Sequence, residues 1–109
     1  MESRRIETFE EMWPYYLNEH RLPATRWWHF AATNIALAAI GVGVFTGKLW
    51  ILPAAIVTAY GMAWFSHFFI ERNKPATFTY PLWSFAADIK LWRLMWTGGI
   101  KKELDQHIT

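Results

Sequence analysis

The sequence predicts an all-α integral membrane protein, a helical bundle built around a central antiparallel transmembrane hairpin. Apolar residues make up 53% of the chain and aromatic residues 18%, with eight tryptophans among 109 residues. Between Trp27 and Ile70 the only charged residue is Lys48, near the middle of this stretch. Two apolar segments separated by one short polar turn are typical of a pair of membrane-spanning helices. The length fits one domain, 1–109.

The charged residues exclude some functions and indicate an orientation. With eleven Lys and Arg against nine Asp and Glu, and no long basic run, we expect no nucleic-acid partner. The absence of cysteine excludes disulfides and thiolate metal sites. Four Lys and Arg residues precede the first apolar segment, one lies in the turn and six follow the second. Because positive residues stay inside, both termini are expected to face the cytoplasm.

The first segment, 1–19, is amphipathic. Five apolar residues recur at helical spacing and form one face: Phe9, Met12, Trp13, Tyr16 and Leu17. We expect a helix that lies on the membrane surface, which Pro14 either kinks or divides into two. The first 26 residues have no apolar core of the signal-peptide type, so no cleaved leader is expected.

Two segments are long enough to cross a bilayer, 24–45 and 49–70. Pro23 suits the start of the first helix. Near its end are Gly41 and Gly43, whose small size lets another helix approach closely. The second segment has 22 residues, which span about 33 Å as an α-helix.

A further helix is predicted over 81–97. It contains Asp88, Lys90 and Arg93, so we expect it to be interfacial or shallowly inserted. The remaining tail, 101–109, is polar and is expected to be loosely ordered.

Three histidines and one carboxylate are predicted to meet at the cytoplasmic end of the hairpin. His29 lies 19 residues before Lys48 and His67 lies 19 residues after it, so the two have the same depth in an antiparallel hairpin. His20 precedes the first span at that end, and Glu71 follows His67 by four residues, on the same face of an α-helix. Imidazole and carboxylate ligands without sulfur suit iron, manganese or zinc, and this set with open positions is typical of non-haem iron oxygenases.

Other interpretations stay open. A single histidine such as His29 is often a hydrogen-bonded structural residue. Asp88 is a ligand, an acceptor for an imidazole N–H, or a solvated charge paired with Lys90 or Arg93. His29 and His67 could also be the two axial ligands of a haem, or the chain could be a membrane scaffold without enzymatic activity. The sequence leaves open whether the chain forms a homo-oligomer.

Four stretches of the chain carry a family resemblance. They are 16–20 (Tyr-Leu-Asn-Glu-His), 28–30 (Trp-His-Phe), 61–78 and 80–84. The most specific block is formed by His67, Glu71, Pro75 and Ala76. In these residues the sequence resembles small bacterial members of the family named for the yeast 2-hydroxy fatty acid dioxygenase.

The resemblance implies a membrane-embedded, iron(II)-dependent dioxygenase. The yeast-type enzyme shortens a 2-hydroxy fatty acid by one carbon, so the implied partners are a fatty-acid or related lipid substrate, O2 and the bilayer. Histidines of the family pattern are taken as iron ligands, and they correspond to His20, His29 and His67. Together with the spacing, the resemblance predicts an Fe2+ site formed by His20, His29, His67 and Glu71, with Asp88 as the next candidate.

Overall fold

The computed structural model describes residues 6–107, and this part of the chain is entirely helical, without strands. The first five residues of the predicted N-terminal helix and the last two of the predicted tail lie outside the described residues. The elements are α1 (Phe9–Asn18), α2 (Pro23–Thr46), α3 (Ile51–Phe65), a π-helix η1 (Ser66–Glu71), a 3-10 turn η2 (Ala76–Phe78), α4 (Pro81–Thr97) and α5 (Ile100–His107).

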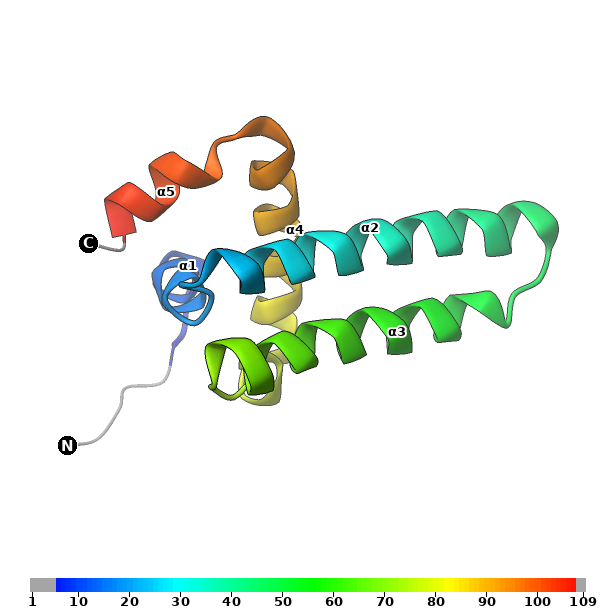
Figure 1. Cartoon of the computed structure of the whole chain (residues 1–109), viewed down its shortest axis with the longest axis horizontal. Helices are drawn as coiled ribbons and strands as arrows, with labels where there is room; N and C mark the ends of the chain where they lie inside the picture. The colour runs from blue at the N-terminus through cyan, green and yellow to red at the C-terminus, as the bar shows by residue number, and fades with distance from the viewer. Residues whose placement is uncertain (1–5, 108–109) are drawn as a thin grey trace.

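A long antiparallel hairpin of α2 and α3 is the main axis of the molecule (Figure 1). Pro23 occupies the first turn of α2, and Gly47, with a left-handed φ of 77°, ends it. The π-helix η1 continues α3, so one helical segment extends from Ile51 to Glu71. Both arms of the hairpin are long and apolar enough to cross a membrane, which confirms the two predicted candidate spans.

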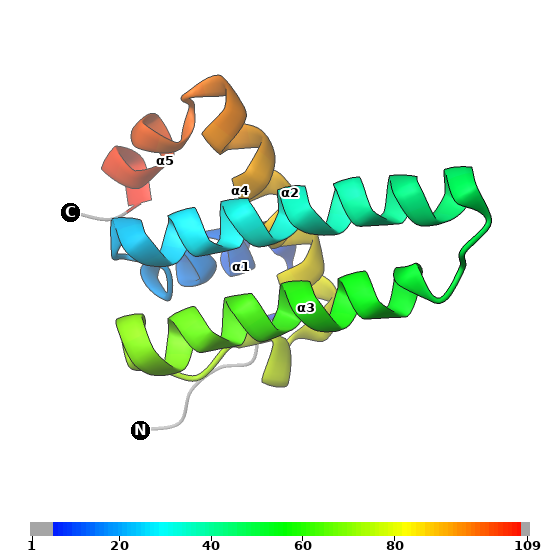
Figure 2. The ribbon, with the colours of Figure 1, turned by 45° about the vertical axis from the view of Figure 1, so that its right-hand side comes forward.

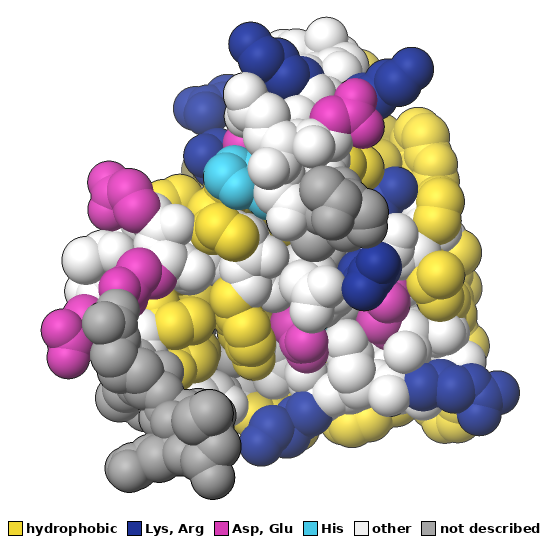
Figure 3. Space-filling view, turned by 90° about the vertical axis from the view of Figure 1, so that its left-hand side faces the viewer, with side chains coloured by type: hydrophobic (Ala, Val, Ile, Leu, Met, Phe, Trp, Pro, Cys, Tyr) yellow, Lys and Arg dark blue, Asp and Glu magenta, His cyan; other side chains and the backbone are white. Residues whose placement is uncertain are grey.

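The other helices gather at the end of the hairpin that lies far from its turn (Figures 1 and 2). There α4 crosses beside the hairpin, and α1 and α5 lie next to it. Seen from this end, the surface carries many acidic and basic side chains (Figure 3). Along the hairpin, by contrast, large apolar side chains such as Val44 and Val57 are exposed.

The predicted apolar face of α1 forms the centre of the hydrophobic core. Met12, Trp13, Tyr16 and Leu17 are at most 4% exposed and pack in one cluster with buried residues of α4. This face of α1 is therefore covered by other helices of the protein, whereas the sequence suggested that it lies on the membrane surface. Pro14 lies inside one continuous helix, so the interpretation as two short helices is wrong.

The polar tail is helical, which corrects the expectation of a loosely ordered segment. Ile100 and Leu104, one helical turn apart in α5, pack against the core. The indole Nε1 of Trp13 also donates a hydrogen bond to Glu103 Oε1 at 2.7 Å. Two apolar residues and one buried donor on α1 are enough to hold an otherwise polar helix.

Gly43 packs closely against the other arm of the hairpin. A Cβ atom at this position would lie 2.7 Å from Leu52 Cδ1 and 3.1 Å from Ile51 Cβ, whereas at Gly41 nothing lies within 4 Å. The predicted role of small residues is confirmed for Gly43, whereas Gly41 has no neighbour that a side chain would meet.

We expect Gly43→Leu to lower the free energy of unfolding by about 1–3 kcal/mol, because the added side chain overpacks the hairpin. The matched variant Gly41→Leu should leave stability unchanged or raise it by up to about 1 kcal/mol, since leucine favours the helix more than glycine does. Denaturant unfolding in detergent micelles measures both, and equal effects at the two positions would contradict this packing.

Candidate metal centre

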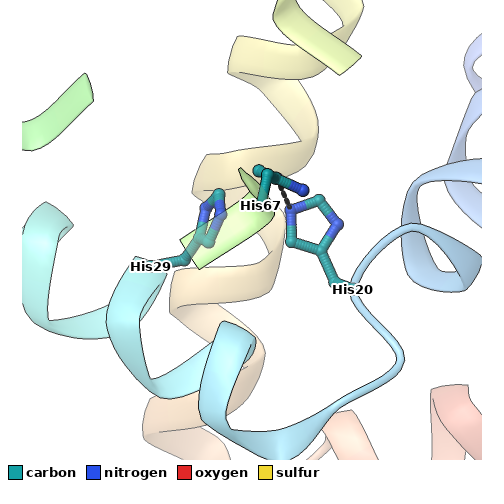
Figure 4. Close-up of side chains that lie close together, drawn as sticks. All are labelled: His20, His29 and His67. Atoms are coloured by element: carbon teal, nitrogen blue, oxygen red, sulfur yellow. Dashed lines mark hydrogen bonds between the residues drawn. The ribbon is translucent and has the colours of Figure 1, made fainter. Parts of the chain in front are cut away.

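Three buried histidines from separate segments come together beside α4 (Figure 4). His20 follows α1, His29 belongs to α2 and His67 belongs to η1. Their exposed fractions are 1%, 7% and 2%. One ring nitrogen from each lies within 4.8 Å of the other two. The structure thus brings together the three histidines that the sequence analysis selected, and this cluster could hold a metal ion.

The orientation of His20 is fixed by the helix that precedes it. Its Nδ1 lies 2.6 Å from the backbone oxygen of Tyr16. A carbonyl oxygen only accepts hydrogen bonds, so Nδ1 carries the proton and Nε2 keeps its lone pair. Burial, followed by the proximity of His29 and His67, lowers the pKa of His20 well below its usual value. The ring is therefore neutral near pH 7 and able to bind a cation.

His67 is oriented by the loop that follows the π-helix. The side-chain nitrogen of Asn73 donates a hydrogen bond to the backbone oxygen of Glu19 at 3.0 Å. The side-chain oxygen Oδ1 of Asn73 therefore faces His67 Nδ1 at 2.7 Å and accepts a hydrogen bond from it. Arg72 has a left-handed φ of 63°, which turns the chain back. The backbone N–H of Asn73 then donates a hydrogen bond to the backbone oxygen of His67 at 2.9 Å. As in His20, the lone pair of His67 is left on Nε2.

His29 has an acidic neighbour on one side and no partner on the other. Its Nδ1 lies 3.6 Å from Asp88 Oδ1, whereas its buried Nε2 has no hydrogen-bond partner among residues 6–107. Asp88 also accepts a hydrogen bond from the Tyr16 hydroxyl. Burial raises the pKa of Asp88 to about 6, and the hydrogen bond from Tyr16 opposes this shift. Of the three roles considered for Asp88, this position matches the acceptor behind an imidazole.

Within residues 6–107, Asp88 forms no ion pair with Lys90. The Lys90 ammonium instead lies 4.4 Å from the centre of the Trp13 ring. Asp88 is 21% exposed and lies beside His29.

The three rings could hold a metal ion between them. His20 Nε2 and His67 Nε2 lie 3.0 Å apart, although neither carries a proton for the other, and His29 Nε2 is buried without a partner. Two ligands at right angles around an ion, each at about 2.1 Å, are about 3.0 Å apart. A cation between these nitrogens would replace lone-pair repulsion with three bonds, and imidazole suits iron, zinc, copper and nickel.

Glu71 does not join the cluster, and its predicted position is corrected. Its Oε1 accepts hydrogen bonds from the Leu22 amide at 3.1 Å and from the Thr25 hydroxyl at 2.7 Å, which caps the start of α2. Placing Glu71 on the face of His67 assumed an α-helix. The segment Ser66–Glu71 is a π-helix, whose wider turn shifts residues four apart out of alignment.

A cavity of about 200 Å³ adjoins the cluster between α2, α3 and α4. His29 and Asp88 belong to its wall, and most of the remaining wall is apolar. Sequence patterns did not indicate this cavity, because its lining residues have the same helical spacing as residues that pack in an ordinary helix interface.

The fold and the site together define a helical protein with two candidate membrane spans and a three-histidine cluster able to hold a metal. The family model described as "2-hydroxy-palmitic acid dioxygenase Mpo1-like" matches residues 6–100, and the chain belongs to this Mpo1-like family. The family resemblance noted in the sequence is thereby confirmed. No curated protein and no solved structure matches the chain.

Because Glu71 caps α2, we expect Glu71→Ala to lower the free energy of unfolding by about 1–2 kcal/mol without loss of bound metal. Denaturant unfolding and elemental analysis of the same preparation measure the two effects. The control Glu10→Ala, at an exposed position of α1, should change stability by less than about 0.5 kcal/mol. Loss of metal from Glu71→Ala would instead identify Glu71 as a ligand.

Because Asn73 fixes the proton of His67, we expect Asn73→Leu to weaken metal binding about 10- to 100-fold. Asn73→Asp keeps an acceptor oxygen for His67 Nδ1 and should weaken binding less. Anaerobic titration with Co2+, followed by its visible absorption, measures the affinities. Asn34→Leu is the control, since Asn34 bonds Trp92 away from the cluster. Equal affinities of Asn73→Leu and the wild type would refute the orienting role.

Proposed function

We propose that this protein is a membrane-embedded, non-haem iron(II)-dependent dioxygenase that shortens 2-hydroxy fatty acids by one carbon. The observation that carries the proposal is the convergence of three buried histidines whose Nδ1 atoms face acceptors, in a chain that belongs to a dioxygenase family. The name of the family indicates the substrate class, a 2-hydroxy long-chain acid.

His20, His29 and His67 would hold the iron through their Nε2 atoms. When bound there, iron(II) would supply the redox chemistry with O2. The chain itself fixes the rings: Tyr16 and Asn73 retain the Nδ1 protons of two of them, and Asp88 stands behind the third. Three protein ligands leave further positions open, as the oxygenase reaction requires.

A membrane location fits the distribution of side chains. The outer faces of α2 and α3 expose apolar residues, among them Phe45 and Val57, whereas the opposite end of the molecule is rich in charge (Figure 3). We infer that α2 and α3 are inserted, with the turn at Thr46–Lys48 outside and the histidine end at the cytoplasmic interface. A substrate that partitions into lipid would then reach the site from the bilayer.

The geometry favours a single ion over haem. The rings of His29 and His67 have centroids 5.0 Å apart, and the ring of His20 lies within 4.5 Å of both. Axial ligands of a haem lie on opposite faces of the macrocycle. The third imidazole occupies the space beside both rings, where a porphyrin between them would have to extend.

We expect protein purified without chelator or affinity metal to contain about one iron per chain, and His67→Ala to contain iron near background. The control His107→Ala, an exposed histidine of α5, should keep the wild-type content. With iron restored anaerobically, the wild type should consume O2 with a 2-hydroxy acid and release the acid one carbon shorter.

Three results would overturn the proposal. A Soret absorption band in the purified protein would identify a haem protein. Metal at background in the wild type, with His29→Ala equally stable, would identify a scaffold. Iron binding without O2 uptake on any 2-hydroxy acid would remove the dioxygenase function while leaving the metal site.

A further inference from the structure

The cavity beside the cluster has polar side chains at its histidine end, with Tyr60 farther along, and an otherwise apolar wall. His29, Thr33, Tyr60 and Asp88 contribute its polar groups. The other lining residues carry no polar side-chain atom: Ala32, Ala36, Leu37, Ile40, Ile56, Ala59, Ala63, Phe85 and Ile89. Such an asymmetric wall suits an amphiphile whose head lies at the histidines and whose tail is a hydrocarbon.

The lining residues can be ordered by depth because the hairpin is antiparallel. Residues equidistant from Lys48 lie at one level, as the contact of His29 with His67 illustrates. By this rule, Leu37 lies level with Ala59, and Ile40 lies level with Ile56. From His29 to Ile40 the cavity follows α2 for about 16 Å, since each residue rises about 1.5 Å.

This length matches one long acyl chain. With carbon–carbon bonds of about 1.5 Å, each methylene advances an extended chain by about 1.3 Å. About 13 methylene groups therefore reach from His29 to Ile40, in addition to the two head-group carbons held at the cluster. The family's described substrate, a hydroxylated palmitic acid, is of this size class.

The cavity is also open to the surroundings of the hairpin. Leu37 is 46% exposed, Ile56 49% and Phe85 56%, so the apolar wall continues onto the outer surface. A hydrocarbon tail can enter sideways between these residues without crossing water, whereas a polar occupant would leave its groups unsatisfied along most of the wall.

We propose that this cavity binds the acyl chain of the substrate in an extended form, with its head at His29, and that the depth between Ala59 and Ile56 sets the longest chain accepted. The inference rests on the proposed function for the identity of the head group. It assigns chain-length selectivity to residues of α2 and α3 that do not touch the metal cluster.

Photo-crosslinking tests the placement without any turnover. Two 2-hydroxy acids of 16 carbons are used, one with a diazirine near the carboxyl end and the other with it near the methyl end, on the metal-loaded protein in micelles. The first should label residues near Thr33 and Ala63, and the second should label residues near Ile40 and Ile56. Labelling of the outer face around Val57, irrespective of the diazirine position, would overturn the inference.

A bulky side chain about three quarters of the way along the cavity tests the selectivity. In Ala59→Phe, about 12 Å from His29 by helix rise, turnover of a 16-carbon acid relative to a 10-carbon acid should fall at least tenfold. The control Val57→Phe places the same side chain on the exposed face of α3 and should keep the wild-type ratio. Elemental analysis verifies that both variants retain the metal.

The two experiments separate this inference from the proposed function. Depth-dependent labelling without turnover of any acid supports the acyl-chain site and refutes the dioxygenase. Turnover of 2-hydroxy acids with an unchanged chain-length ratio in Ala59→Phe, or with labelling independent of diazirine position, refutes the acyl-chain site and leaves the dioxygenase in place.

Discussion

The rest of the site depends on one constraint, which is that the Nδ1 atom of each imidazole faces an acceptor outside the cluster. His20 is held by the carbonyl of Tyr16 and His67 by the amide oxygen of Asn73, and Asp88 lies behind His29. These acceptors come from α1, from the loop after the π-helix and from α4. The acceptors of His20 and His67 leave Nε2 as the lone-pair atom of these two rings, so the segments that carry the rings and their acceptors must be placed together for the two nitrogens to converge.

The π-helix is the local distortion that makes this convergence possible. Its wider turn directs His67 into the cluster and sends Glu71 to the start of α2, where it caps the amide of Leu22. Arg72 then adopts the left-handed conformation, an unfavourable one for a side chain with a Cβ, so that Asn73 can return to His67. Single-turn π-helices within α-helices occur often at functional sites, and here the extra width serves ligand placement directly.

The features that were predicted correctly are those that depend on the length and regular spacing of residues along a helix. The hairpin and the convergence of His29 with His67 follow from apolar length and equal distance from Lys48, and the structure contains both. The displacement of Glu71 was not predictable, because no residue type signals a π-turn. The helicity of the tail depends on Trp13 of α1, a contact too distant in the chain for a local pattern to indicate. The single domain over 1–109 and the ligand roles of the histidines stay predictions.

Burial of the cluster explains why the site would favour a cation over solvent. An unsatisfied polar atom in the interior costs about 1–3 kcal/mol. Within the described part of the chain, His29 Nε2 has no hydrogen-bond partner, and the Nε2 atoms of His20 and His67 face each other without a proton between them. Protonation offers no relief, since burial and the adjacent imidazoles lower the pKa of His20 well below its usual value. The chain therefore holds three neutral imidazoles, which could act as metal ligands, beside an apolar cavity. An ion bound there would meet the head group of a lipid and little water.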